Sequence, residues 1–483
     1  MCGITGIILD SAKNNKPSVL LRAMTDAIVH RGPDDSGYFE TKCTQGRTYV
    51  GLGHRRLSII DLSTGHQPMT NEDKSIHIIF NGEIYNYLEL HDDLKLKGHL
   101  FTTNSDTEVI IHLYEEYGLD CVKKLRGMFA FAIWDSKKER LLLARDRFGK
   151  KPLFYFHQDG LLLFSSEIKS ILKFTEIKFA INDAVISDYL VYRYVPGPYT
   201  LFKGILKLQP GSTAVWQNNS FKTQRFFYPP DSKPNNKVIL RNNVVKSFLD
   251  ELDEAVRIRM VSDVPYGAFL SGGIDSSAIV ALMTRHSSFP VKTFSVGFHE
   301  EQYNEIPYSR IIAEKFKTEH HELLITAEHL MDELPKLIFY RDAPVSETAD
   351  IPLYLLSMYA RNTVKMVLTG EGSDEIIGGY PKHVYEKFVP IYQMFPSFIR
   401  QKIFEPFILS LPYNFHRAKT AIINLGLSNE HDRLPRWFGS LTQKEVCKFL
   451  DPKFLMSSGN EKFHFKTERE TSYLRKILYF DQT

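Results

Sequence analysis

The sequence predicts an α+β sandwich followed by an α/β domain with a doubly wound parallel sheet. Short β-branched runs separated by polar or Gly/Pro turns dominate the first half. Strand and helix patterns alternate in the second half, which indicates parallel strands joined by helices. A Pro- and Lys-containing segment at 228–234 separates the two patterns. We therefore expect a first domain at 2–215, a linker at 216–240 and a second domain at 241–483.

Apolar and β-branched runs locate the individual elements. In the first half we expect strands at 2–9, 49–52, 76–80, 128–134, 141–144 and 161–165, and a helix at 108–117. In the second half we expect strands at 265–270, 291–296 and 364–368, with helices at 244–261, 276–285 and 309–316. The aromatic-rich stretch 388–415 is interrupted by Pro, Lys, Arg and Glu. We expect it to form core helices rather than a membrane anchor.

Composition excludes several classes of protein. The net charge is +3, from 60 basic and 57 acidic residues, so no overall field favours nucleic acid or an anionic membrane. No run of about 18 apolar residues and no secretory signal is present, so no membrane span is expected. The four cysteines form no CxxC pair, which argues against a disulfide framework or a zinc site. We expect a cytoplasmic protein.

A cysteine directly follows the initiator methionine. The small residue at position 2 allows removal of Met1, which would leave Cys2 as the first residue. A terminal cysteine carries its thiol beside a free α-amine, whose ordinary pKa of about 7.7–8.0 lets it act as a base. A cysteine at this position also arises by chance, so further motifs must support the assignment.

Four polar motifs follow Cys2 in a fixed order. They are HRGPD at 30–34, HRRLSI at 54–59, NGEIYN at 81–86 and SDTE at 105–108. Taken singly, RGPD could be an ordinary turn and NGE a hairpin, and Ser105 or Asp106 could be a helix N-cap, because Glu108 follows Ser105 at capping-box spacing. Together they resemble the glutaminase domain of class II amidotransferases, which are N-terminal nucleophile hydrolases. The resemblance runs from Cys2 to about Tyr155 and implies the fold of that group.

The resemblance also implies roles for individual residues. Cys2 would attack the side-chain amide of glutamine, and Asn81 and Gly82 would form the oxyanion hole. Arg56 would bind the α-carboxylate of glutamine, and Asp106 its ammonium group. Glu83 could contact the same ammonium.

A Gly-rich turn between a short apolar strand and a helix dominates the second half. The residues are Ser271, Gly272, Gly273, Ile274, Asp275, Ser276 and Ser277. Glycines let the backbone approach an anion, and a helix N-terminus offers free N–H groups. The three serines can donate to phosphate oxygens, and the aspartate can hold Mg2+. No Gly-Lys-Ser/Thr follows, so the turn is not a Walker loop.

This turn resembles the pyrophosphate loop of the PP-loop ATP pyrophosphatases. These enzymes cleave ATP between the α- and β-phosphates and leave AMP on a carboxylate or carbonyl group. The resemblance places the adenosine beside the strand at 293–298, with Met260 and Val296 lining the adenine. Core packing accounts for these two apolar residues equally well.

A second acidic motif follows the strand at 364–368. It reads Thr369, Gly370, Glu371, Gly372, Ser373, Asp374 and Glu375. Ligands bind at the carboxyl ends of strands in open α/β sheets, and three close carboxylates favour a cation or an ammonium group. The motif resembles that of asparagine synthetases, in which Thr369 and Gly370 would face the nucleotide. Glu371 would assist formation of the acyl-adenylate, and Asp374 would hold Mg2+ or the amino acid.

The two halves together resemble glutamine-hydrolysing asparagine synthetases over nearly the whole chain. This implies that ammonia released at Cys2 travels inside the protein to an aspartyl-AMP formed with ATP and Mg2+. It implies glutamine, aspartate and ATP as small-molecule partners, with no nucleic acid or membrane and a possible homodimer. Family members usually continue beyond residues like those at 478–483, so we expect the part with a phosphate-facing lysine to be missing.

Two alternatives remain open at this point. The segment from Asp342 to Leu353 resembles members grouped with surface-polysaccharide pathways, so the acceptor could be a sugar uronic acid or another carboxylate. The chain could also be a glutaminase with an inactive second domain.

Overall fold

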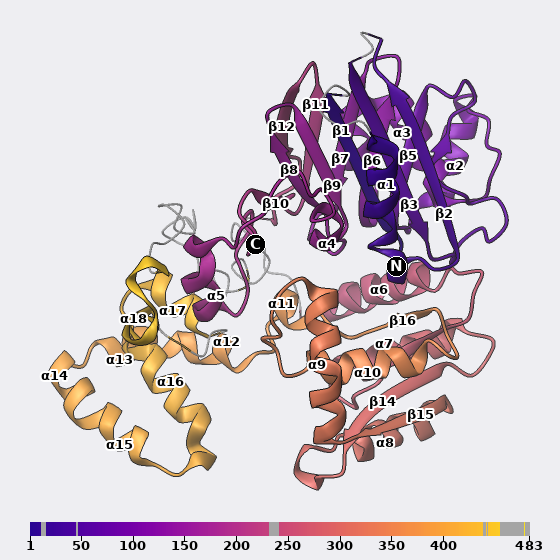
Figure 1. Ribbon diagram of the computed structural model, residues 1–483. Helices are drawn as coiled ribbons and strands as arrows, with labels where there is room; N and C mark the ends of the chain where they lie inside the picture. Colours follow the sequence, from indigo (N-terminus) through magenta and orange to yellow (C-terminus); the bar gives the residue numbers. More distant parts are fainter. Residues whose placement is uncertain are drawn as a thin grey trace. The chain divides into compact units, whose positions relative to one another are not determined.

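The computed structural model describes residues 1–10, 16–44, 47–230, 241–437, 441, 443–454 and 478. Contacts between residues gather this chain into two compact units. The first comprises residues 1–180, 197–228 and the described residues from 241 to 370. The second comprises 181–196, 229–230 and the described residues after Gly370. The first unit holds three sheets, two antiparallel and one parallel (Figure 1).

The first antiparallel sheet has six strands in the order β10-β8-β9-β1-β3-β2. Their bounds are β1 Gly3–Asp10, β2 Asp35–Lys42, β3 Thr48–Arg56, β8 Phe154–Gln158, β9 Leu161–Ser165 and β10 Ile205–Lys207. Helices α1 (Pro17–Asp26) and α4 (Ile168–Ile171) pack on one face. Side chains of β1 alternate between the faces, as the pleat requires. Ile7 and Leu9 pack with Leu21 of α1, whereas Ile4 and Ile8 face the other sheet.

The second antiparallel sheet also has six strands, in the order β12-β11-β7-β6-β5-β4. Their bounds are β4 Met69–Thr70, β5 Ile76–Ile84, β6 Gly127–Asp135, β7 Arg140–Arg145, β11 Ser212–Gln217 and β12 Ser220–Arg225. Helices α2 (Tyr87–Leu96) and α3 (Asp106–Tyr117) cover its outer face. Ile79 and Trp134 point inward to the first sheet, and Ile78 and Phe131 point outward to α3. The expected α+β sandwich is confirmed.

The third sheet is parallel, with four strands in the order β15-β14-β13-β16. Its strands are β13 Tyr266–Phe269, β14 Lys292–Phe298, β15 Glu319–Ile325 and β16 Met366–Leu368. The helices are α6 Arg241–Arg259, α7 Ile274–His286, α8 Ile306–Phe316, α9 Ala327–Arg341 and α10 Asp350–Ala360. Ala268 packs into a core with α6, α7 and α8, and Phe269 packs on the opposite face with α10. Helices therefore cover both faces, and the doubly wound sheet is confirmed.

The second unit is helical. Its helices are α5 Ile186–Tyr192, α11 Ser373–Ile377, α12 Pro381–Tyr385, α13 Val389–Gln393, α14 Ser397–Ile399, α15 Glu405–Ser410, α16 His416–Gly426, α17 Glu430–Arg436 and α18 Gln443–Phe449. The helix α5 packs against α17 and α18, although it lies in the first half of the sequence. A buried ion pair joins Arg433 Nε to Glu386 Oε1 at 3.0 Å.

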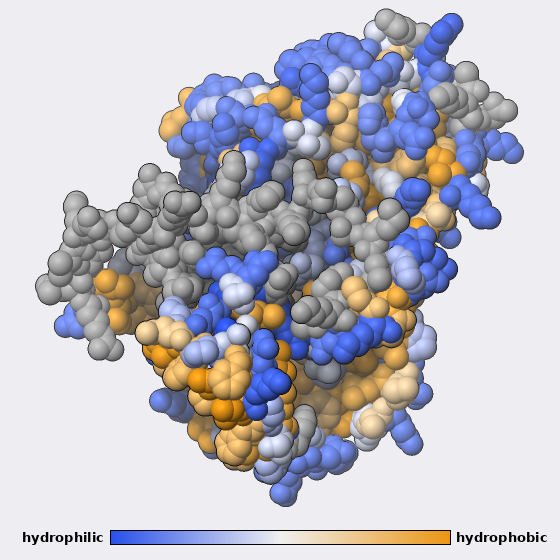
Figure 2. All heavy atoms as spheres, turned by 90° about the vertical axis from the view of Figure 1, so that its left-hand side faces the viewer, coloured by the Kyte–Doolittle hydropathy of each residue, from blue (hydrophilic) through white to orange (hydrophobic). Residues whose placement is uncertain are grey.

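The helices expected at 388–415 are present, but only part of the stretch lies in a core, where Val389 and Tyr392 pack with Leu425. Met394 is 83% exposed, Phe398 63% and Phe407 65%. Figure 2 shows hydrophobic surface on the face turned to the viewer. The helices α13 to α15 are each six residues or shorter. Helices this short present too small a face to bury every apolar side chain.

Shorter helical segments connect these elements. Turns of 3-10 type lie at Val29–Arg31, Gly118–Lys123, Asp183–Val185, Glu301–Tyr303, Glu386–Phe388, Tyr413–Phe415 and Pro452–Phe454, and a π-helical turn at Arg400–Phe404. The strand β12 continues the sandwich to Arg225, inside the range expected for a linker. Residues 231–240 of that range lie outside the described residues. Among the described residues, no helix is long and apolar enough to cross a membrane.

Candidate active site

Cys2 lies at the start of β1, beside the end of β3. The pairing of Gly3 with Arg55 sets this position. The sulfur of Cys2 accepts a hydrogen bond from the Leu57 N–H at 3.4 Å and lies 3.6 Å from the Leu57 carbonyl oxygen. Burial raises the pKa of the Cys2 thiol. The thiol is therefore protonated at neutral pH, and a nucleophilic role requires a base.

The α-amino group at the start of the chain can supply that base. Burial lowers the pKa of the Met1 amine to about 5, and the neighbouring charges of Arg31 and Lys151 act in the same direction. An amine in this place is neutral at pH 7 and has a free electron pair. After removal of Met1 the amine would belong to Cys2 itself.

Asn81 and Gly82 lie within β5, opposite Ala130 and Phe129 of β6. The side chain of Asn81 is 0% exposed, and neither its Nδ2 nor its Oδ1 has a hydrogen-bond partner. A buried unpaired polar group costs about 1–3 kcal/mol. A Cβ at Gly82 would lie 2.1 Å from the Met128 carbonyl oxygen, so only glycine fits this strand position. The free amide of Asn81 is therefore available to a ligand.

One cation and two carboxylates share the same region of the sandwich. Arg56 ends β3 and donates from Nη2 to the Ile60 carbonyl oxygen at 3.1 Å. Asp106 begins α3, and its Oδ2 accepts the Ile84 N–H at 2.9 Å. Burial raises the pKa of Asp106 to about 6, and burial together with Asp106 raises that of Glu83 to about 8. A bound ammonium group would lower both values.

Three charged residues around Cys2 have no role in the expectations drawn from the sequence. The Nε of Arg31 donates to the Cys2 carbonyl oxygen at 2.9 Å, and its Nη1 contacts Glu167 Oε1 at 2.9 Å. Lys151 Nζ lies 3.1 Å from the Met1 sulfur, and burial lowers the pKa of Lys151 to about 8. Arg31 belongs to the HRGPD motif and could have been found there. Glu167 has no motif that indicates it.

The Gly-rich turn joins β13 to α7 at the carboxyl edge of the parallel sheet. The hydroxyls of Ser271 and Ser276 lie 3.0 Å apart, and the Gly273 N–H donates to Ser271 Oγ at 3.3 Å. Gly272 has a φ of +82°, and a Cβ there would lie 2.5 Å from the Cβ of Tyr308. The glycine is therefore required by conformation and by space. The turn curls around the N-terminus of α7, where N–H groups favour an anion.

Oxygen groups in the first turn of α7 suit a phosphate with its metal. Asp275 lies in that turn and is partly exposed. The Oγ of Ser277 is buried without a hydrogen-bond partner. Carboxylate and phosphate oxygens are the ligands that Mg2+ prefers. The residues present therefore fit Mg2+ and a phosphate group.

The end of β16 approaches this turn. A Cβ at Gly370 would lie 2.6 Å from the Ser276 backbone nitrogen, so Thr369-Gly370 passes directly over the start of α7. β16 and β14 flank β13, which brings their carboxyl ends to one edge. Met260 is 8% exposed and packs in the core with Val256 and Leu270. Val296 packs partly buried against the other face.

Glu371 and Asp374 belong to the second unit. Glu371 is exposed. Asp374 lies in α11, and the turn after the helix brings Gly379 so close that a Cβ there would overlap Asp374 Oδ1. Tyr380 donates its hydroxyl to Glu375 Oε1 at 2.7 Å. The approach of Asp374 and Glu371 to the nucleotide stays a prediction.

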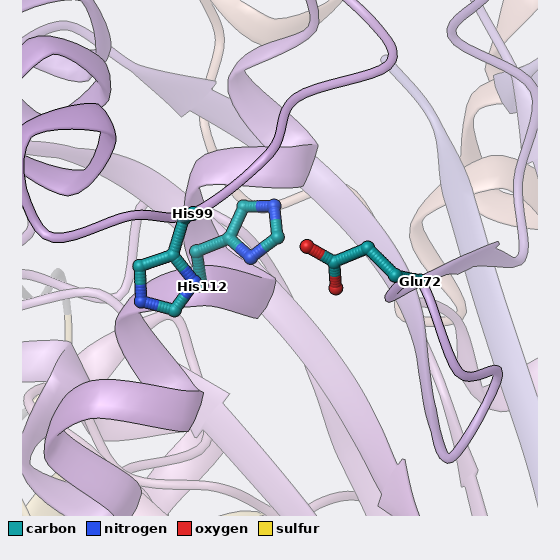
Figure 3. Close-up of side chains that lie close together, drawn as sticks. All are labelled: Glu72, His99 and His112. Atoms are coloured by element: carbon teal, nitrogen blue, oxygen red, sulfur yellow. The ribbon is translucent and has the colours of Figure 1, made fainter.

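Another cluster of titratable groups lies away from Cys2. Figure 3 shows the carboxylate of Glu72 directed toward the imidazoles of His99 and His112, with ligand atoms within 4.8 Å of one another. Ligands bound to one tetrahedral metal at about 2.1 Å lie about 3.4 Å apart. His112 Nδ1 contacts Glu115 Oε2 at 2.8 Å, and His99 Nε2 contacts Glu116 Oε1 at 3.1 Å.

Ion pairs with neighbouring glutamates account for the positions of these histidines. Burial opposes the imidazolium, but the hydrogen bond to Glu115 and the carboxylate of Glu108, which lies 3.9 Å from Nε2, outweigh it and raise the pKa of His112 to about 9. An imidazolium has no free electron pair for a metal. The cluster is therefore an ion-paired network on the outer side of the sandwich.

Known proteins match both halves of the chain. A model of the glutamine amidotransferase domain matches residues 1–227, and a model of asparagine synthase matches residues 247–483. The Bacillus subtilis (strain 168) protein named asparagine synthetase [glutamine-hydrolyzing] 1 is 35% identical over 489 residues, covering 100% of this chain and 75% of the relative. A Methanocaldococcus jannaschii relative is 39% identical over 421 residues, and the match covers 83% of this chain and 79% of the relative.

Proposed function

Because this chain belongs to the glutamine-hydrolysing asparagine synthetases, we propose that it transfers the amide nitrogen of glutamine to the β-carboxylate of aspartate, with cleavage of ATP to AMP and pyrophosphate. The family carries both halves of this reaction, a glutamine amidotransferase domain and an asparagine synthase domain. The unpartnered buried amide of Asn81 in the first half is the observation that most supports the glutaminase step.

Glutamine would bind between Arg56 and Asp106. The guanidinium of Arg56 would pair with the α-carboxylate, and Asp106 with the ammonium group, which Glu83 could also contact. Both carboxyls have raised pKa values because they are buried, so a cation that lies between them gains a strong interaction. This arrangement would hold the α-carboxylate and ammonium groups and leave the side chain of the amino acid free to reach Cys2.

The α-amine would take the proton of the Cys2 thiol as the sulfur attacks the amide carbon of glutamine. Negative charge then develops on the amide oxygen. Asn81 Nδ2–H and the Gly82 N–H would donate to this oxygen, a contribution of about 2.7–4 kcal/mol for one donor. The intermediate collapses to ammonia and a thioester, and water hydrolyses the thioester to glutamate and the free thiol.

The second half would activate aspartate. The β-carboxylate attacks the α-phosphorus of ATP, which forms β-aspartyl-AMP and releases pyrophosphate. The turn from Ser271 to Ser277 would bind the pyrophosphate through backbone N–H groups and hydroxyls. Asp275 and Asp374 would hold Mg2+, which neutralises phosphate charge. Glu371 would assist formation of the acyl-adenylate. Ammonia then attacks the aspartyl carbonyl carbon and displaces AMP, which gives asparagine.

Replacement of Cys2 by alanine tests the division of labour between the halves. C2A removes the only proposed nucleophile, so glutamine hydrolysis falls by at least about 10³-fold. Ammonia-dependent asparagine formation stays within about twofold of wild type, because Cys2 takes no part in the second half-reaction. Both rates are measured by amino-acid chromatography on the same preparation. Glutamine hydrolysis retained in C2A would contradict the assignment of the nucleophile.

A further inference from the structure

A buried ion network joins the start of the chain to helix α9 of the parallel-sheet domain. Its members are Arg31, Glu167, Lys169 and Asp342, and each of these side chains is at most 9% exposed. All four belong to the first compact unit. Buried charges persist only where each has a partner in good geometry. The network therefore holds its members in a common arrangement.

The network begins at the nucleophile. The Arg31 guanidinium donates from Nε to the Cys2 carbonyl oxygen at 2.9 Å and from Nη1 to Glu167 Oε1 at 2.9 Å. His30 Nε2 lies 2.9 Å from the other oxygen of Glu167. Burial opposes ionisation of Glu167, but the His30 hydrogen bond and the charges of Arg31 and Lys169 lower its pKa to about 2. Glu167 thus fixes the arginine that holds the Cys2 backbone.

The network ends at the C-terminus of α9. Lys169 Nζ bonds to Glu167 Oε2 and lies 3.2 Å from Asp342 Oδ1, and the Lys169 N–H donates to Asp342 Oδ2 at 3.2 Å. Lys169 Nζ also donates to the Tyr340 carbonyl oxygen at 3.3 Å. The Tyr340 ring packs on His30 with centroids 4.8 Å apart. Movement at the end of α9 therefore acts on Lys169, Glu167 and Arg31 together.

The chain after Asp342 gives this connection a functional partner. Asp342 adopts a left-handed conformation, with φ of 54°, and turns the chain out of α9. An ion pair between Arg341 and Asp350 ties this turn to the start of α10. The turn 342–349 lies within the segment from Asp342 to Leu353, whose resemblance bears on the identity of the acceptor. Binding in the parallel-sheet domain would shift the network from this end.

We infer that Glu167, Lys169 and Asp342 are positioning residues for Cys2, which make the placement of the nucleophile depend on the conformation of the turn after α9. The inference rests on the proposed function only in taking Cys2 as the nucleophile. The three residues act through Arg31 and do not touch glutamine. Changes to them should therefore alter kcat for glutamine hydrolysis and leave KM for glutamine nearly unchanged.

The test compares D342N and K169M with a matched control in the full chain. E254Q breaks the exposed ion pair between Arg126 Nη1 and Glu254 Oε1 (2.6 Å), which also bridges the sandwich and α6 but is not part of the network. We expect kcat for glutamine hydrolysis to fall about tenfold in D342N and K169M with KM within twofold. K169R restores at least half of the rate, and E254Q stays within twofold.

The dependence of glutamine hydrolysis on the parallel-sheet domain is measured by adding ATP, Mg2+ and aspartate. We expect these to raise kcat for glutamine hydrolysis in wild type and E254Q, and to leave it unchanged in D342N. A kcat in D342N equal to that of wild type, with the same stimulation by ATP, Mg2+ and aspartate, would overturn the inference. An equal loss in E254Q would also overturn it, because the effect would then not be specific to the network.

A second readout separates this inference from the proposed function. The rate of Cys2 alkylation by iodoacetamide is followed by peptide mass spectrometry, with the exposed thiol of Cys447 as an internal reference. If the wild-type chain does not hydrolyse glutamine, the proposed function fails, but the alkylation experiment still applies. A change of at least threefold in the Cys2-to-Cys447 ratio in D342N and not in E254Q supports the network, and an unchanged ratio overturns it.

Discussion

Asn81 has an unfavourable environment, which a substrate bound at the proposed oxyanion hole would relieve. Its amide is fully buried in β5 and forms no hydrogen bond. Folding a polar group into such a place costs stability that packing elsewhere must offset. The sequence motif NGEIYN located this residue, but it did not reveal that both polar atoms would lack partners. That property depends on the two sheets and became visible only in the structure.

Replacement of Asn81 by alanine tests the oxyanion role. N81A removes one donor, so kcat for glutamine hydrolysis should fall about 10²–10³-fold. The thermal stability should stay the same or rise, because an unpaired polar group is removed from the interior. Steady-state kinetics and thermal unfolding measure the two effects. A loss confined to KM, with kcat unchanged, would contradict stabilisation of the transition state.

Asp106 illustrates a conflict between function and stability. Its pKa rises from an ordinary value of 3.8 to about 6 because the carboxyl is buried. A raised pKa means that the native state resists ionisation, so the folded protein loses stability as pH rises from about 4 to about 6. About 2 pH units correspond to about 3 kcal/mol as an upper bound.

D106N should therefore be more stable than wild type above pH 6, by about 1–3 kcal/mol. The asparagine oxygen can still accept the Ile84 N–H. The advantage should vanish below pH 4, where Asp106 is protonated in both states. Urea unfolding at pH 4 and pH 8 measures the difference. Glutamine hydrolysis should be lost, and a variant that is less stable at pH 8 would show that the carboxylate has a partner this account omits.

At the level of elements, the sequence predicted most central strands but missed β8 and β11 among them, and it missed every edge strand except β16. The run of apolar residues in β6 and the helical spacing of α3 both placed their elements correctly. β2, β12 and β15 are edge strands with mainly polar sequences, so their alternation carries no apolar signal. Propensity alone does not separate such strands from loops.

Helix ends and exposed helices were partly predictable. Ser105 caps α3 by accepting the Thr107 N–H, as its position before the apolar run indicates. Glu108 does not complete a capping box and instead accepts from Thr102 and Thr103. Only some of the apolar side chains at 388–415 are buried, because an apolar side chain becomes buried only where another surface covers it. The ion network could not be predicted from the sequence, because Arg31, Glu167 and Asp342 are far apart along the chain.

The Gly-rich turn yields a prediction for one element alone. D275A removes the carboxylate proposed to hold Mg2+ at the start of α7, so ATP-dependent pyrophosphate release should fall at least about 10²-fold. Glutamine hydrolysis measured without ATP should stay within twofold, because Asp275 lies on the other sheet domain. A coupled pyrophosphate assay and glutamate formation give the two rates. Equal loss of both would mean that D275A disrupts the fold rather than the site.

At the scale of the whole molecule, contacts link the two chemistries within the first unit. Lys365 Nζ, just before β16, lies 2.7 Å from Asp34 Oδ2 of the HRGPD motif. The Asp61 N–H, in the segment after Arg56, donates to Asp263 Oδ2 at 2.7 Å. Both segments, in which the proposed glutamine site lies, thus contact the parallel-sheet domain directly. The sequence predicted two chemistries on one chain, but the contacts between them depend on tertiary structure.

The central claim is that one chain moves nitrogen from glutamine to aspartate through an adenylate. The most direct measurement supplies glutamine labelled with 15N in its side-chain amide, together with aspartate, ATP and Mg2+, and follows products by mass spectrometry. The account predicts one AMP and one pyrophosphate for each asparagine formed, with 15N in the asparagine side chain. Labelled ammonia without asparagine, or ADP and phosphate in place of AMP and pyrophosphate, would contradict it.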